Sequence, residues 1–335
     1  MEQIDTLIIS GGGIKSVAVI GSLNYLNEIG ILKNIKKYAG TSAGSFIITL
    51  LVMNYTPDEI EQTVFSQGNS LIKESYFMII YNMFKNYGIY SANKMYNYLE
   101  SLFEAKGFNK NITFKQLYEK TSKILTLTGT SVSEQDTFYF NCYTQPNMKV
   151  IDAVRISISI PIYFTSVKHI FNSQIHTLVD GGVLENFPLY YYDICELTGN
   201  WIFKSSDLKE HKKNLISNNL FVESKELTKT IGILLSDKVN NNNILKNVNT
   251  FFQEYHQINN ISDYFTLLMN TVLDKIEESN FRNPLTGAKD NFFKETIIIE
   301  LPIKVSAIDF NLSKSNKNIL ITTGYDSAKQ FFILS

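Results

Sequence analysis

Histidine, cysteine and arginine are scarce in this chain of 335 residues. Its two cysteines, Cys142 and Cys195, cannot build a disulfide framework or a cysteine-rich zinc site, so a reduced, intracellular setting is expected. No two histidines stand four residues apart, the spacing of a metal-binding pair on a helix. We therefore expect no metal site. Any catalytic imidazole must belong to His169, His176, His211 or His256.

The chain also lacks a charge excess and long apolar runs. Its 31 basic residues nearly balance its 32 acidic ones, for a formal net charge of −1, so no basic field favours nucleic acid. The longest apolar stretches, near residues 46–53 and 76–84, fall well short of the roughly 20 residues of a spanning helix. The first residues lack the basic and apolar pattern of a signal peptide. A soluble intracellular protein without a transmembrane helix is expected.

The start of the chain alternates between strand-like and helix-like patterns. An apolar run over residues 5–10 ends at three glycines, and apolar residues at helical spacing follow over 17–26. A strand or short lead-in at residues 38–39 precedes a second glycine turn and an apolar helix over 45–53. This order predicts an α/β fold, with three α/β/α layers and a mainly parallel central sheet.

Periodicity and turn residues predict further elements. We expect a hairpin over 124–130 and 137–143, a helix over 152–159, strands over 175–179, 230–235 and 296–301, and loops over 204–226 and 240–243. These polar stretches do not separate two self-contained patterns, so one domain is expected.

An aromatic-rich stripe runs along a predicted helix near residue 80. Phe77, Ile80, Phe84 and Tyr87 recur at helical spacing. The stripe is expected to pack in the core. The alternatives are that it caps a binding site or dips into a membrane surface.

Residues 40–44 read Gly-Thr-Ser-Ala-Gly, which fits the G-x-S-x-G pattern of a nucleophile elbow. In such an elbow Ser42 lies on a sharp turn between a strand and a helix. The small flanking residues Gly40 and Gly44 allow strained backbone angles, and the helix N-terminus supplies a positive potential. Ser42 is therefore a candidate nucleophile.

Gly11, Gly12 and Gly13 form a glycine loop between the first strand and the first helix. Such a loop can point N–H groups at an anion, either a phosphate or the oxyanion of an acyl transfer. The Walker pattern fails around Lys15, and the dinucleotide pattern is only nearly met. The acidic residue expected for dinucleotide binding is missing, which disfavours nucleotide binding.

Asp180-Gly181-Gly182 follows an apolar strand. An aspartate at a strand end before two glycines can reach into a cleft without a bulky neighbour. Taken alone, the motif also fits a solvated turn.

Together these three motifs resemble the patatin-like phospholipase (lipid acyl hydrolase) family. The resemblance extends to Asp152-Ala153-Val154-Arg155 with the Ser157, Ser159 and Pro161 that follow, and to residues 87–91 and 113–118. The resemblance covers residues 4–190, and a weaker similarity to the family is found at residues 309–313 and 324–325. It implies one patatin-like domain over 4–335, with a motif core at 4–190 and a variable part at 191–335.

The resemblance implies acyl-ester hydrolysis of phospholipids by a Ser–Asp dyad, without metal or cofactor. Ser42 would be the nucleophile and Asp180 the base. The implied oxyanion donors are Gly11, Gly12 and Gly13, and the supporting motif residues are Lys15, Gly40, Gly44, Gly181 and Gly182. Two positions depart from the family pattern, because Ser16 replaces a glycine and Ile162 a small residue.

The implied partner is a membrane or micellar lipid contacted peripherally, with no nucleic acid and with a protein activator left open. Two alternatives stay open. One is an α/β-hydrolase triad that adds His211 or His256 to Ser42 and Asp180, although the elbow follows only one clear strand. The other is a catalytically silent lipid-binding protein that keeps the motifs.

Overall fold

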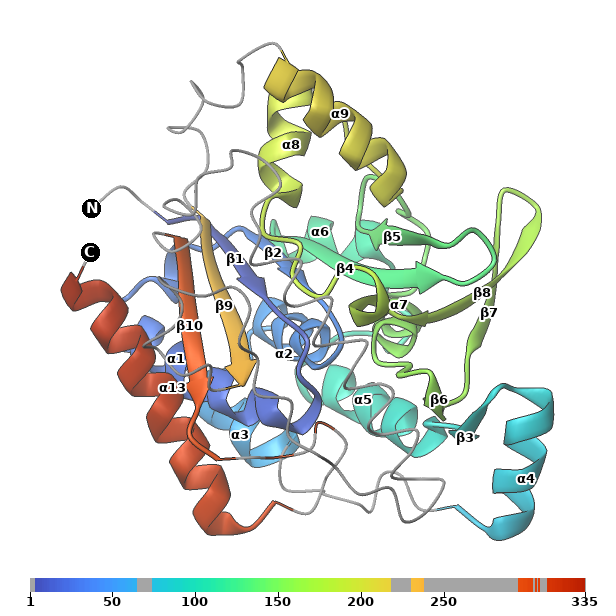
Figure 1. The fold of residues 1–335 in the computed structure, drawn as a ribbon, viewed down its shortest axis with the longest axis horizontal. Coiled ribbons are helices and arrows are strands. Elements are labelled where there is room, and N and C mark those ends of the chain that lie inside the picture. The colour runs from blue at the N-terminus through green and yellow to red at the C-terminus, as the bar shows by residue number, and fades with distance from the viewer. Residues whose placement is uncertain are drawn as a thin grey trace, which may run out of the picture.

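A computed structural model describes residues 4–64, 74–217, 230–237, 295–303, 305, 307 and 312–334. Within these residues the centre is an eight-stranded sheet in the order β10-β9-β1-β2-β4-β8-β7, with β5 paired to β4 (Figure 1). The parallel strands are β1 (Thr6–Ile9), β2 (Lys37–Gly40), β4 (Ile124–Ser131), β9 (Thr230–Asp237) and β10 (Thr296–Leu301). The strands that pair with their neighbours in antiparallel orientation are β5 (Asp136–Phe140), β7 (Val167–Phe171) and β8 (Gln174–Asp180).

The register of the parallel strands brings two of the predicted motifs to one edge of the sheet. Ile9, the last residue of β1, pairs with Gly40, the last residue of β2. The glycine loop and the serine turn therefore leave the sheet side by side. Asp180 reaches the same region from β8, whose end pairs with Gly129 in the interior of β4.

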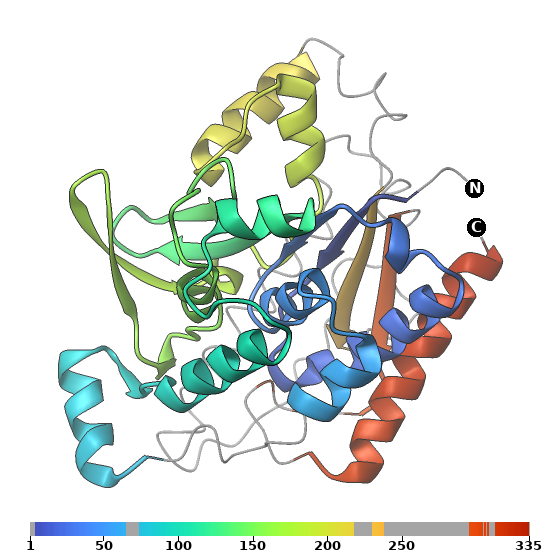
Figure 2. The same ribbon diagram turned by 180° about the vertical axis from the view of Figure 1, so that it is seen from behind.

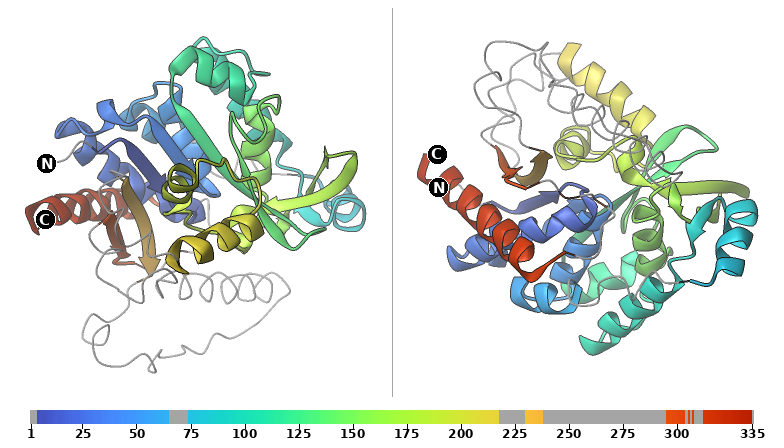
Figure 3. Two further views of the ribbon diagram at one scale, coloured as in Figure 1. Left: turned by 90° about the horizontal axis from the view of Figure 1, so that it is seen from above. Right: turned by 60° about the horizontal axis from the view of Figure 1, so that its bottom comes forward.

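Helices cover both faces of the sheet (Figure 3). The helices on one side are α1 (Val17–Glu28), α2 (Ala43–Val52), α3 (Pro57–Val64), α5 (Asn93–Ala105), α6 (Phe114–Thr121), α7 (Val150–Ser157) and α13 (Lys314–Leu334), and of these α3 and α5 pack on neighbouring helices. The opposite face packs against α8 (Tyr191–Thr198) and α9 (Ser205–Ser217). Short 3-10 turns are η1 (Gly13–Ser16), η2 (Leu32–Asn34) and η4 (Gly181–Val183).

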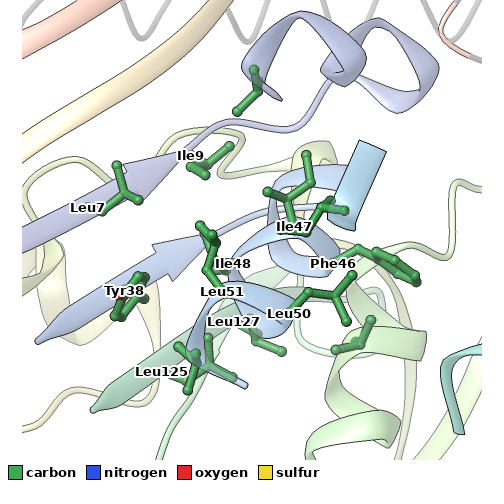
Figure 4. Close-up of a cluster of buried hydrophobic side chains, with 14 of the residues drawn as sticks. Leu7, Ile9, Tyr38, Phe46, Ile47, Ile48, Leu50, Leu51, Leu125 and Leu127 are labelled. Atoms are coloured by element: carbon green, nitrogen blue, oxygen red, sulfur yellow. The ribbon is translucent and has the colours of Figure 1, made fainter. Parts of the chain in front are cut away.

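The strand sequences explain why both faces are covered. Side chains alternate across a strand, so Leu7 and Ile9 enter the larger core while Ile8 enters the smaller one. Figure 4 shows Leu7 and Ile9 close to side chains of α2, which lies against β1 and β2. A strand that is apolar on both sides has to be buried on both sides, as in α/β proteins.

A small extension lies beside this sandwich. It consists of α4 (Tyr76–Lys85) and a two-stranded parallel sheet of β3 (Gly88–Tyr90) and β6 (Ile162–Phe164). Seen from the front and from behind, α4 lies at the periphery of the molecule (Figures 1 and 2).

The predicted α/β fold with its mainly parallel sheet is confirmed, as are the hairpin and the strands at 175–179, 230–235 and 296–301. The loop expected from residue 204 is wrong over 205–217, where α9 forms. Its sequence is mostly polar, but Leu208 and Leu215 are buried in the smaller core and hold it there. The loop expected at 240–243 lies outside the described residues.

The expected burial of the aromatic-rich stripe is also wrong. Phe77, Ile80, Phe84 and Tyr87 are 76%, 57%, 79% and 59% exposed. The residue that α4 buries is the polar Asn82. A periodic pattern indicates a helix but does not show whether another element covers its apolar side. None of the helices in the described ranges combines the length and apolar character needed to cross a bilayer.

Candidate active site

Ser42 lies on a strained turn between β2 and α2. Its φ of 53° and ψ of −127° are rarely adopted by a residue with a side chain. Two close approaches hold the turn. A Cβ on Gly40 would come within 3.0 Å of the Gly44 backbone, and one on Gly44 would lie 2.6 Å from the carbonyl oxygens of Ile9 and Ser10. Only glycine therefore fits at either flank.

The side chains of Ser42 and Asp180 are hydrogen-bonded to each other. The Ser42 Oγ donates to Asp180 Oδ2 over 2.6 Å, although 138 residues separate the two in sequence. The other carboxylate oxygen, Oδ1, accepts a hydrogen bond from the Gly182 N–H over 2.7 Å. The Asp180 N–H donates to the Ser159 carbonyl over 2.9 Å. Both the side chain and the backbone of Asp180 are thus fixed.

Burial gives this carboxyl group unusual basicity. Asp180 is only 4% exposed, and desolvation raises its pKa from 3.8 to about 7. The hydrogen bonds from Ser42 and Gly182 act in the opposite direction, but they are weaker than the effect of burial. A carboxylate with a pKa near 7 can accept a proton at neutral pH, which an ordinary aspartate does poorly.

The glycine loop passes directly beside the serine. A Cβ on Gly11 would lie 3.0 Å from the Cβ of Ser42. The Gly11 N–H donates to the Asn186 carbonyl over 3.2 Å, so in this structure it is not free to serve as the oxyanion donor that the resemblance implied. In the described part of the chain, the N–H groups of Gly12 and Gly13 have no backbone acceptor. The loop thus leaves two amide groups without a backbone acceptor directly after Gly11, the glycine that lies beside Ser42.

Two glycines after the aspartate permit its close packing. A Cβ on Gly181 would lie 2.1 Å from Thr128 Oγ1, and one on Gly182 would lie 3.0 Å from Asn186 Oδ1. Lys15 lies in η1, just beyond the glycine loop, and is half-buried. The glycines that flank or touch Ser42 and Asp180 therefore lie around the bond between these two residues.

Sequence reasoning gave no role to Ser157 and did not single out Asn186. Ser157, at the end of α7, accepts a hydrogen bond from the Ser42 N–H at its Oγ over 3.0 Å. The Asn186 side chain lies against both Gly11 and Gly182. Ser157 belongs to the segment that resembled the family, but nothing in the sequence indicated its contact with Ser42.

The buried Arg155 side chain is linked to Asp180 through Ser159. The Arg155 guanidinium donates to Ser159 Oγ, to the Ser91 carbonyl over 2.8 Å and to the Thr165 carbonyl over 3.0 Å. Ser159 in turn accepts the Asp180 N–H at its carbonyl oxygen. Arg155 therefore connects the chain around β3 and β6 to the strand end that carries Asp180.

Three of the four histidines, His169, His176 and His211, lie in the described residues. His169 and His176 face each other across the β7–β8 hairpin, and His176 Nδ1 lies 3.4 Å from Glu134 Oε1. His211 lies on α9, and His256 is outside the described residues. No histidine in the described part of the chain shares a hydrogen bond with Ser42 or Asp180. The same residues hold no group of three or more His, Cys, Asp or Glu side chains suited to a metal ion.

A strained serine turn, an aspartate hydrogen-bonded to that serine and a glycine loop thus lie together at one end of the α/β sheet. Comparison with known proteins gives the family. The model of the family "Patatin-like phospholipase" matches residues 7–193, more than half of the chain. The chain belongs to the patatin-like phospholipase family.

Similar proteins come from viruses and bacteria. An uncharacterized protein of Acanthamoeba polyphaga mimivirus is 30% identical over 99% of this chain and 95% of its own length. The "Probable lipid hydrolase 463L" of Invertebrate iridescent virus 6 is 31% identical over 63% of this chain and 72% of its own length. Among solved structures, VipD from Legionella pneumophila has the same fold, with a TM-score of 0.54 and 14% identity over 99% of this chain and 67% of its own.

Proposed function

We propose that this protein is a lipid acyl hydrolase that cleaves fatty-acyl esters of phospholipids through an acyl-enzyme on Ser42. Membership of the patatin-like phospholipase family and the similarity to a viral lipid hydrolase support lipid hydrolysis. The observation that carries the finer proposal is the 2.6 Å hydrogen bond from Ser42 Oγ to a buried aspartate whose pKa is raised to about 7.

The reaction proceeds in two acyl transfers. Asp180 accepts the proton of Ser42 Oγ while that oxygen attacks the ester carbonyl. The N–H groups of Gly12 and Gly13 stabilise the negative charge on the carbonyl oxygen. Asp180 then returns its proton to the leaving alkoxide, which departs as an alcohol and leaves an acyl-serine ester. Water, deprotonated by Asp180, attacks this ester and releases the fatty acid, and Ser42 recovers its proton.

The supporting contacts fit this cycle. Ser157 accepts the Ser42 N–H and holds the strained turn during the attack. Gly182 holds the second carboxylate oxygen, so Asp180 keeps Oδ2 directed toward the serine. Water exclusion by the buried surroundings keeps the carboxylate basic, because desolvation disfavours its charged form.

Replacing the nucleophile tests the proposal. We expect Ser42→Ala to lower fatty-acid release from phospholipid vesicles by ~1,000-fold or more, since the acyl-enzyme can no longer form. A fluorophosphonate probe should label wild-type protein at the peptide that contains Ser42, and Ser42→Ala should not react. Ser101→Ala, which changes an exposed serine on α5, is the matched control and should keep full activity.

Three outcomes would contradict this assignment. Unchanged lipid hydrolysis in Ser42→Ala would place the chemistry elsewhere. Loss of activity in a folded His211→Ala/His256→Ala variant would indicate the triad instead of the dyad. Absence of both labelling and hydrolysis in the wild type would favour a silent lipid-binding protein.

A further inference from the structure

Helix α4 has its polar side inward and its apolar side outward. Eight of the eighteen large hydrophobic residues that are exposed in the described chain fall within residues 76–87. Tyr76 is 87% exposed, Phe77 76% and Phe84 79%. This reverses the usual arrangement of a helix on a globular protein, whose apolar stripe faces the core.

Polar contacts attach α4 to the rest of the molecule. The Asn82 side-chain amide donates to Glu74 Oε2 over 2.8 Å and to the Ile89 carbonyl over 3.3 Å. Glu74 also accepts the Ser91 N–H over 2.8 Å, and Asn86 donates to Asn82 Oδ1 over 3.1 Å. These bonds fix the orientation of the helix, so its apolar side faces outward as a feature of the fold.

We propose that α4 is a membrane-docking helix whose apolar side inserts at the boundary between the headgroups and acyl chains of an anionic bilayer. This inference rests on the proposed lipid substrate and names the surface that would meet it. The occupant we commit to is the lipid surface, and a second copy of the chain is an outcome of the test.

The shape of the apolar surface favours a bilayer over a protein groove. At 100° per residue, Met83, Tyr76, Ile80, Phe84, Phe77 and Tyr81 cover roughly half of the helix circumference. A partner helix would cover a narrower stripe, whereas a bilayer can surround the whole exposed arc. Tyrosines and phenylalanines are also the residues that favour the membrane interface.

The exposed charged residues beside the apolar side of the helix are lysines, which match an anionic surface, whereas Glu74 is engaged by Asn82 and Ser91. Between Tyr76 and Tyr87 the sequence has no acidic residue, and its one charged residue is Lys85. A second lysine, Lys168 on β7, places its ammonium group 5.9 Å from the centre of the Tyr87 ring. Lysines beside an aromatic patch can reach lipid phosphates while the rings enter the apolar region.

The position of α4 connects docking to the active site. The helix lies at the end of the molecule toward which β1 and β9 run, the end where the glycine loop begins (Figure 1). It leads into β3, which pairs with β6, and the Ser166 N–H bonds back to the Asn86 carbonyl over 3.0 Å. Arg155 then joins this extension to Ser159 and so to Asp180. A docked α4 would therefore hold the catalytic edge of the sheet near the lipid.

Vesicle binding by an inactive protein tests the proposal without degrading the lipid. The full chain carrying Ser42→Ala is floated with phosphatidylcholine/phosphatidylserine vesicles, with and without Phe77→Ser/Phe84→Ser. We expect the double substitution to weaken binding ~100-fold, because two large side chains no longer enter the apolar region. The matched control Ile333→Ser/Leu334→Ser removes two exposed apolar residues at the end of α13 and should bind normally.

The same substitutions in the active protein separate docking from chemistry. With Ser42 present, Phe77→Ser/Phe84→Ser should lose hydrolysis of vesicle lipid but keep hydrolysis of a water-soluble short-chain ester. If no ester is hydrolysed by the wild type, the proposed function fails, yet the flotation result still stands. Unchanged vesicle binding in the α4 variant would overturn the docking helix. An equal loss of vesicle binding in the α13 control would also overturn it. So would a dimer that forms with wild-type α4 and is lost in the α4 variant while vesicle binding stays the same, because the apolar side would then be a contact between two copies of the chain.

Discussion

At the scale of single residues, burial determines what Asp180 can do. The same desolvation that disfavours its charge makes it a base suited to neutral pH. A second carboxyl group nearby shares this property. The pKa of Glu185 is raised to about 7 by burial, and its carbonyl oxygen accepts a hydrogen bond from Thr41, the neighbour of Ser42. A change of activity with pH near neutrality could therefore reflect the ionisation of either Asp180 or Glu185.

The pH dependence of hydrolysis distinguishes them. Asp180 must be ionised to accept the serine proton, so kcat/KM for a soluble ester should rise with pH, reach half its maximum near pH 7 and level off above it. Below the midpoint the rate should fall about tenfold per pH unit. Glu185→Gln should keep the same profile. A midpoint that moves in Glu185→Gln, or a profile that stays flat down to pH 5, would contradict the role of Asp180.

At the scale of elements, glycines allow a close contact between two helices, α1 and α13. A Cβ on Gly21 of α1 would lie 1.8 Å from the Ile321 carbonyl oxygen, and one on Gly324 of α13 would lie 1.8 Å from the Ala18 carbonyl oxygen. Ser22 Oγ also donates to the Gly324 carbonyl over 2.7 Å. The two helices therefore pack backbone to backbone where these glycines meet.

This contact predicts an unusual effect of alanine in a helix. Gly324→Ala should lower the free energy of unfolding by about 1–3 kcal/mol, because the added methyl group forces α1 and α13 apart. In an exposed helix interior the same change would stabilise the protein. Thr322→Ala, an exposed position on α13, is the matched control, and urea unfolding measures both. Equal or greater stability of Gly324→Ala would show that the helices can separate without cost.

The elements themselves were mostly predictable from the sequence. Apolar strands that are followed closely by glycines, such as β1 and β8, have local signals that do not depend on their neighbours. Helix α9 was missed because two buried leucines, Leu208 and Leu215, outweigh its polar sequence. The orientation of α4 was missed because periodicity gives the spacing of apolar residues but not what covers them.

At the scale of the whole molecule, the chain beyond the family match completes the sheet. The match ends at residue 193, yet β1 lies between β2 and β9. Helix α13, close to the end of the chain, packs against α1 and β10. The strand β1, which leads into the glycine loop, therefore depends on strands that come late in the sequence, which supports the prediction of one domain over residues 4–335.

Truncation tests this prediction of a single domain. A chain that ends at Ser217 lacks β9, β10 and α13, which leaves β1 as an apolar edge strand and uncovers α1. We expect it to aggregate and to show no cooperative thermal transition by circular dichroism, whereas the full chain should unfold cooperatively. A soluble, active and cooperatively unfolding truncated chain would show that residues up to 217 form an independent domain.

The sequence by itself determined the fold class, most of the strands of the main sheet and the two loops that carry Ser42 and Asp180. These follow from local signals, because side-chain periodicity and turn glycines act over a few residues. Only the tertiary structure decided that Ser42 and Asp180 meet at 2.6 Å, that Ser157 holds the serine amide and that burial raises the pKa of the aspartate. Those properties depend on desolvation and on contacts between distant segments, which no local pattern specifies. The same holds for α4, whose apolar side faces outward because polar contacts with other segments attach it.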